Sequence, residues 1–220
     1  MNMTFQKVGN DFGFENVDSE FSPFRELKIK WCRTMDNASF TVSDYPEEAP
    51  IEVIEGIART IFSKIRAEEE TGYPECAMGW LTSDGFRDMN QERYIERSRD
   101  IGHTGEAENE RLWEAYRRLV DAGLIGEIKG LRLFWSNDKS VSKACQSSCL
   151  MRVVIMNRRL LGSEVPHEVL DYCLLHEIAN ISTDFGIDIL ERRKEVTDIM
   201  SEYPGKEIAR NWLYRVMMEI

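Results

Sequence analysis

The feature that most constrains the fold is a short apolar run followed by a proline and a long helical pattern. The run VVIM, residues 153–156, is rich in β-branched and large apolar residues and has the length of one buried strand. Pro166 then precedes HEVLDYCLLHEIANIS, whose start signal and apolar spacing are those of a helix. We therefore expect residues 166–181 to form one helix packed on a sheet that contains residues 151–157, with four largely buried side chains: Val169, Tyr172, Cys173 and Ile178.

The rest of the chain predicts an α+β fold with a small mixed sheet and several helices. Leu27, Ile29 and Trp31 alternate with other residues as in a half-buried strand, and SFTVS is the expected hairpin partner. Further strands are expected over residues 131–136 and 148–157. Helical spacing, with proline and glycine at the ends, predicts helices within residues 43–70, 74–82, 86–99, 108–125 and 189–202, and after Gly205.

The N-terminal segment, residues 1–24, carries phenylalanines without any helical or strand period. They stand at Phe5, Phe12, Phe14, Phe21 and Phe24. We expect this Phe-rich arm to be irregular. No internal repeat, low-complexity tract or long linker divides the remainder, so residues 25–220 are expected to form a single domain.

The charge balance argues against two classes of partner. The chain has 28 Lys and Arg against 39 Asp and Glu, a formal net charge of −11. Nucleic acids and anionic membranes attract positively charged surfaces, so we expect neither to bind. No apolar run approaches the about 18 residues of a membrane span, and the start lacks a secretory signal pattern. We expect a cytoplasmic protein whose five scattered cysteines are free thiols.

The strongest chemical signal is HEIAN, residues 176–180, inside the predicted helix. Residues four apart share a helix face, so His176 and Asn180 project side by side, with Glu177 about 100° round the axis. In the H-E-x-x-H motif of zinc hydrolases, two imidazoles hold the metal and the glutamate activates a bound water. Here the second imidazole is replaced by an amide, which is a poor ligand for zinc.

The segment NRRLLGSEVPHEVLDYCLLHEIAN resembles the strand, turn and active-site helix of the SprT-like and YgjP-like zincin metallopeptidases. TVSDYPEEAPIEVIEGIARTIF and YPGKEIARNWL resemble segments of archaeal members of this group. The resemblance extends over residues 25–216 and is strongest over 151–213. It implies a zincin-like fold with His176 as the first metal ligand, Glu177 as the general base and Asn180 at the place of the second ligand.

The sequence departs from this family in its metal ligands. Family members bring a third histidine from the segment after the helix, and no histidine follows His176 here. Cys173, one turn before His176, offers an alternative zinc corner. We expect it to be an ordinary buried thiol and zinc to be absent or substoichiometric. The downstream acids that offer an oxygen ligand are expected to lie on a solvated face; they are Asp184, Asp188, Glu191 and Glu195.

Three functions follow as hypotheses. The leading one is a degenerate, catalytically silent metallopeptidase-like protein, without a cofactor, that binds a peptide or protein by strand addition at the sheet edge. The second is an active metal-dependent peptidase or hydrolase whose zinc ligands are rebuilt from His176 and either Cys173 or a downstream carboxylate, with Glu177 as base. The third is a regulatory or structural subunit that engages a partner through the Phe-rich arm.

Overall fold

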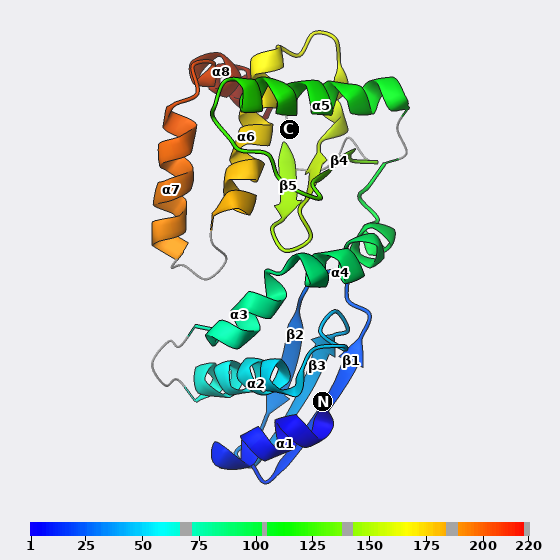
Figure 1. Cartoon of the computed structure of the whole chain (residues 1–220), viewed down its shortest axis with the longest axis vertical. Helices are drawn as coiled ribbons and strands as arrows, with labels where there is room; N and C mark the ends of the chain where they lie inside the picture. The colour runs from blue at the N-terminus through cyan, green and yellow to red at the C-terminus, as the bar shows by residue number, and fades with distance from the viewer. Residues whose placement is uncertain (67–71, 103–104, 138–142, 184–188, 218–220) are drawn as a thin grey trace. The chain divides into compact units, whose positions relative to one another are not determined.

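The structure is a computed structural model that describes the chain except for residues 67–71, 103–104, 138–142, 184–188 and 218–220 (Figure 1). The described residues form an α+β structure with eight α-helices and two small mixed sheets of three strands each, which confirms the expected α+β class, although one sheet was expected. Contacts divide the chain into two compact units, Met1–Arg97 and Ser98–Ile220. Each unit has its own cluster of buried apolar side chains.

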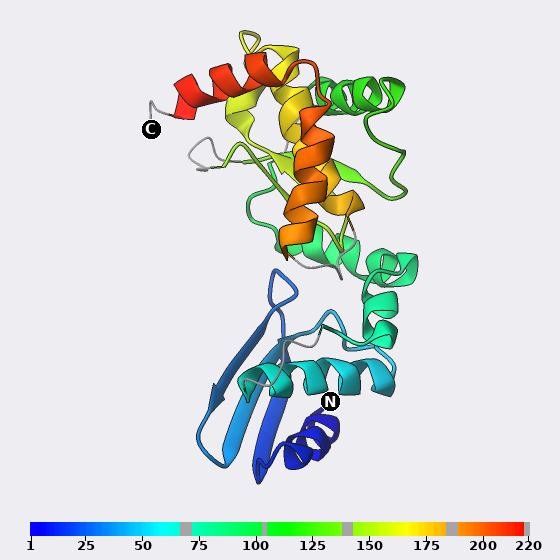
Figure 2. The same cartoon turned by 90° about the vertical axis from the view of Figure 1, so that its left-hand side faces the viewer.

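The first unit is a three-stranded sheet covered on one face by helices (Figures 1 and 2). Its strand order is β1-β3-β2, with β1 parallel and β2 antiparallel to β3. The β2–β3 pair is the predicted hairpin. Ala38, Phe40 and Val42 alternate along β3 and are buried in the core of the unit. The elements are α1 (Asn2–Asp11), β1 (Asn16–Ser22), β2 (Ile29–Arg33), β3 (Asn37–Ser43), α2 (Ile51–Ile65), α3 (Glu75–Leu81) and α4 (Asp84–Arg97).

The prediction of an irregular Phe-rich arm over residues 1–24 is wrong, because this segment forms α1 and β1. Phe5 and Phe14 are each 1% exposed, and their rings lie 6.4 and 5.4 Å from the ring of Phe62 on α2. These contacts join residues far apart in the sequence, so the local spacing of apolar residues does not predict them. The boundary at residue 24 is also wrong, since the arm shares one core with the strands and helix that follow it.

The single domain predicted over residues 25–220 is replaced by the two units, with the division at Arg97. The sequence carries no linker there: α4 ends at Arg97 and Ser98 is buried. The division arises because two separate apolar clusters form, one within each unit.

The second unit contains the predicted HEIAN helix. Its sheet has the order β4-β6-β5, with β4 parallel and β5 antiparallel to the fully buried central strand β6. The strand predicted over 148–157 is shorter than expected, because residues 149–152 turn between β5 and β6. The elements are α5 (Glu106–Asp121), β4 (Arg132–Trp135), β5 (Cys145–Ser148), β6 (Val153–Met156), the 3-10 helix η1 (Arg158–Leu161), α6 (His167–Ser182), α7 (Ile189–Ser201) and α8 (Lys206–Met217).

Helix α6 confirms the prediction made from Pro166 and the apolar spacing. It begins directly after Pro166 and packs on β5 and β6 as well as on α5, α7 and α8. Val169, Cys173 and Ile178 are buried as expected, whereas Tyr172 is only partly buried. Within the described ranges, no helix is long and apolar enough to cross a membrane.

Candidate functional site

The HEIAN residues occupy two sides of α6. His176 has a side chain 49% exposed and shares an open face with Asn180, as the i to i+4 spacing predicts. Glu177 is 8% exposed and faces the sheet. The helix therefore directs the imidazole and the amide outward and the carboxylate inward, toward β5.

Both oxygens of the Glu177 carboxylate bind partners within the unit. Ser147 on β5 donates its hydroxyl to Oε2 at 2.5 Å, and the Cys145 thiol donates to Oε1 at 3.4 Å. His176 Nδ1 lies 3.1 Å from Oε1. Burial raises the pKa of Glu177, but the hydrogen bonds from His176, Ser147 and Cys145 lower it, and the net shift is downward. Glu177 is thus an ionised carboxylate at neutral pH that joins α6 to β5.

The outward pair is held by local hydrogen bonds. The bond to Glu177 raises the pKa of His176, although partial burial opposes the shift. When Nδ1 donates to Glu177, Nε2 is the free ring nitrogen. The Asn180 amide donates to the main-chain oxygen of His176 at 2.9 Å, and its nitrogen lies 3.5 Å from Nδ1. The Asn180 amide is therefore bound to the backbone of its own helix.

Of the cysteines near α6, Cys173 is buried, whereas Cys145 and Cys149 are partly buried. The Cys145 sulfur also lies 3.4 Å from the main-chain oxygen of Cys173, so its one S–H proton is shared between that oxygen and Glu177 Oε1. The hydrogen bond with Cys173 and burial together raise the pKa of Cys145 well above its ordinary value, so this thiol is neutral at pH 7. Cys173 is 3% exposed and does not line the open face beside His176. The five cysteines of the chain are free, as predicted, but they are not all the buried thiols that were expected, because Cys32 and Cys76 are exposed.

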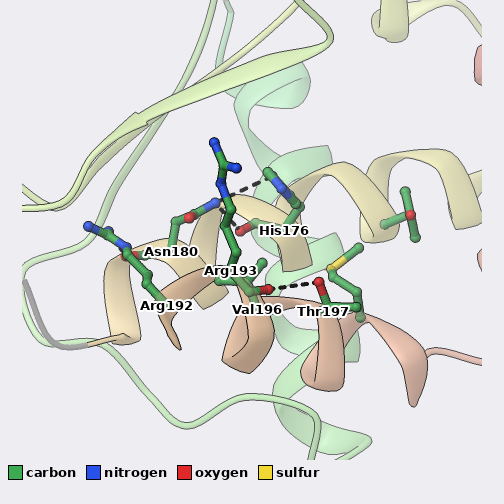
Figure 3. A pocket seen from close by; sticks show the side chains of 8 residues that line it. His176, Asn180, Arg192, Arg193, Val196 and Thr197 are labelled. Atoms are coloured by element: carbon green, nitrogen blue, oxygen red, sulfur yellow. Dashed lines mark hydrogen bonds between the residues drawn. The ribbon is translucent and has the colours of Figure 1, made fainter. Parts of the chain in front are cut away.

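A pocket of about 640 Å³ opens between α6 and α7 (Figure 3). Helix α6 contributes Tyr172, His176 and Asn180, and α7 contributes the rest of the lining: Arg192, Arg193, Val196, Thr197 and Met200. The sequence did not single out the two arginines, because the only role considered for this stretch was an oxygen ligand from its acids, which were expected on a solvated face. The sequence does carry one signal that Arg193 lacks an ion pair within its own helix. Its helical neighbours three and four positions away contain no acid; they are Ile189, Leu190, Val196 and Thr197.

The two arginines differ in their contacts. Arg192 donates through Nη2 to the main-chain oxygen of Asn180 at 2.5 Å and lies 2.8 Å from the Cys149 sulfur, so it covers the C-terminal end of α6. Arg193 is exposed, and the Thr197 hydroxyl donates to its main-chain oxygen at 2.7 Å. Within the described part of the chain, neither guanidinium forms an ion pair with a carboxylate.

The described donors do not fit the zinc site that the family resemblance implies. No group of three or more His, Cys, Asp or Glu side chains is placed to hold a metal among the described residues. Glu191 and Glu195 are exposed and do not line the pocket, while Asp184 and Asp188 lie outside the described residues. The polar groups that line the pocket include one imidazole, one amide and two guanidinium groups. The positive charges of the two guanidinium groups repel a divalent cation.

Comparison with family models, with curated proteins and with solved structures finds no match to this chain. The chemistry of the site therefore has to be inferred from its own geometry.

Proposed function

We propose that the second unit is a degenerate, catalytically silent metallopeptidase-like structure with a zincin-like fold that binds a peptide or protein segment. The observation that carries this proposal is the lining of the α6–α7 pocket, where Arg192 and Arg193 accompany His176 and Asn180. A zinc hydrolase needs three protein ligands around the ion and an open position for water. Two guanidinium groups instead favour an anionic occupant.

The position of Glu177 supports the loss of catalysis. A general base must lie within hydrogen-bond reach of the proton that it removes. The Glu177 carboxylate faces β5 and accepts hydrogen bonds from Ser147 and Cys145. Both of its oxygens are therefore used to hold α6 against β5. A carboxylate in this environment stabilises the contact between α6 and the sheet.

Binding a peptide requires no metal. Strand β5 pairs with β6 on one side only and is an edge strand of the described sheet, which is the arrangement that accepts an extended peptide by strand addition. The α6–α7 pocket adds an apolar wall of Val196 and Met200 next to polar groups, the usual composition of a side-chain binding site.

The silent-enzyme part of the proposal is tested by casein hydrolysis with added zinc, cobalt or manganese, together with elemental analysis of protein purified without chelators or metal-affinity resin. We expect no turnover and zinc well below one ion per chain. Turnover that both a chelator and Glu177→Gln abolish would refute the proposal. Near-stoichiometric zinc that is lost in Cys173→Ser would support the rebuilt-site alternative instead.

The binding part is tested by probing a peptide array with the labelled full chain and measuring the affinity of the selected peptides by fluorescence anisotropy. We expect a defined set of peptides to bind without being cleaved. If no peptide on the array binds, the proposed function is wrong.

A further inference from the structure

We infer that the α6–α7 pocket binds a carboxylate group of its peptide ligand and that Arg193 is the residue that contacts it. This inference rests on the proposed peptide-binding function and names the chemistry that the pocket recognises. It starts from one contrast: the chain has a net charge of −11, yet this pocket is lined by two arginines and no acid among the described residues.

The lack of an ion pair at Arg193 differs from the pattern elsewhere in the chain. Arg97 binds Asp44 through two hydrogen bonds of 2.6 Å, and Arg118 binds Asp171 at 2.6 and 3.0 Å. Several further arginines have carboxylate partners in their own unit, namely Arg59, Arg87, Arg117 and Arg158. The guanidinium of Arg193 has no such partner in the described part of the chain.

The acids of α6, Glu168, Asp171 and Glu177, do not line the pocket. Asp171 is 4% exposed and bound to Arg118, and Glu177 accepts from Ser147 and Cys145 on the opposite side of the helix. On α7, Glu191 and Glu195 are exposed and outside the lining. The positive charge inside the pocket is therefore not balanced by the carboxylates that the structure describes.

Arg192 strengthens this positive charge without being the main contact. Its Nη2 is held by the Asn180 main-chain oxygen and the Cys149 sulfur, and its Nε is buried without a hydrogen-bond partner among the described residues. The guanidinium is thus fixed in place before a ligand arrives, so little of its conformational freedom is lost on binding. Arg193 remains free to present its planar donor edge (Figure 3).

The rest of the lining favours a carboxylate attached to an aliphatic group. One free guanidinium pairs with a carboxylate through two parallel hydrogen bonds. The partly buried Tyr172 ring and the Val196 and Met200 side chains offer apolar contact for the carbon atoms next to it. Two parts of a peptide have this chemistry: an apolar C-terminal residue with its free carboxylate, and a glutamate side chain.

The test uses small probes that carry one carboxylate each. N-acetyl-leucine represents a peptide C-terminus, N-acetyl-glutamate α-amide represents an acidic side chain, and N-acetyl-leucinamide is the uncharged control. Inorganic phosphate is the fourth probe. Each is titrated into the full chain while the ¹H–¹⁵N signals of the backbone and of the arginine side chains are recorded by NMR.

We expect one or both carboxylates to bind with a Kd of about millimolar and to shift the Arg193 side-chain signal, whereas the amide has no effect. Whichever carboxylate binds more tightly identifies the part of the peptide that occupies the pocket. Arg193→Gln should weaken binding about tenfold or more, the value of one charge-assisted pair. Lys194→Gln is the matched control: it removes the same charge from the adjacent, exposed position outside the pocket, and binding should change less than twofold.

The inference is wrong if N-acetyl-leucinamide binds as tightly as the two carboxylates, or if phosphate binds and the carboxylates do not. It is also wrong if no probe shifts the Arg193 signal, or if Arg193→Gln and Lys194→Gln weaken binding equally. This failure is distinguishable from failure of the proposed function. Array peptides that bind the chain regardless of their carboxylates and of Arg193→Gln would leave peptide binding intact. If the small carboxylates bind and no peptide on the array does, the carboxylate site is supported and the proposed peptide-binding function is wrong.

Discussion

The structural role assigned to Glu177 predicts that Glu177→Gln destabilises the second unit. The substitution keeps the shape of the side chain, but it removes the negative charge from a group that is 8% exposed and accepts three hydrogen bonds. The bonds from His176 and Ser147, at 3.1 and 2.5 Å, contribute most, since the thiol bond from Cys145 is long and weak. Hydrogen bonds to a charged group contribute about 1.5–3 kcal/mol, so we expect a loss in this range.

Hydrogen exchange measured by mass spectrometry over increasing urea concentrations gives this free energy from peptides of α6 alone. With a denaturant slope of about 2 kcal/mol/M, the α6 transition of Glu177→Gln should occur about 1 M earlier than in the wild type. Ser147→Ala should lose part of the same stability, and the double variant should show a coupling of at least about 0.5 kcal/mol. Glu195→Gln, an exposed acid on α7, is the control and should lie within about 0.5 kcal/mol of the wild type.

A Glu177→Gln variant that is as stable as the wild type, or more stable, would refute this structural role of Glu177. That result would mean that the charged Glu177 does not stabilise the fold, as is common for catalytic residues. It would favour the active-enzyme hypothesis over the catalytically silent one.

Three further predictions concern other parts of the chain. Phe62→Ala should destabilise the first unit by about 3–5 kcal/mol, measured by hydrogen exchange in α2, because the ring is fully buried among the phenylalanines of the N-terminal segment. Hydrogen bonds from Arg97 lower the pKa of Asp44 below 3.8, so the stability that this pair adds is present above that pH and lost as pH falls through the lower folded-state pKa. Urea unfolding at a series of pH values should therefore show Asp44→Asn weaker than the wild type at pH 7 and the difference shrinking in acid. Asn180→His should not create casein hydrolysis with added zinc, because it supplies only a second imidazole to a pocket that keeps two guanidinium groups; turnover in this variant would contradict that account.

The sequence alone determined most of the local structure, including the helix that carries HEIAN. The proline at its start and the apolar spacing along it specify where α6 begins and that Val169, Cys173 and Ile178 are buried, since both are local properties of the chain. The i to i+4 rule likewise placed His176 and Asn180 on one face and Glu177 on another. It could not show what each face meets.

Tertiary structure decided the features that depend on partners distant in the chain. Phe5 and Phe14 have no periodic pattern, yet they are core residues because Phe62 and Phe40 surround them. Ser147 stands 30 positions before Glu177 and became its hydrogen-bond donor only when β5 packed on α6. Arg193 was not singled out from the sequence, and the α6–α7 packing places it in one pocket with His176, where none of the described lining residues is an acid. The spacing of residues along a helix shows which side of it is apolar and which is charged. The charge balance of a pocket depends instead on which two helices face each other, and long-range packing determines that pairing.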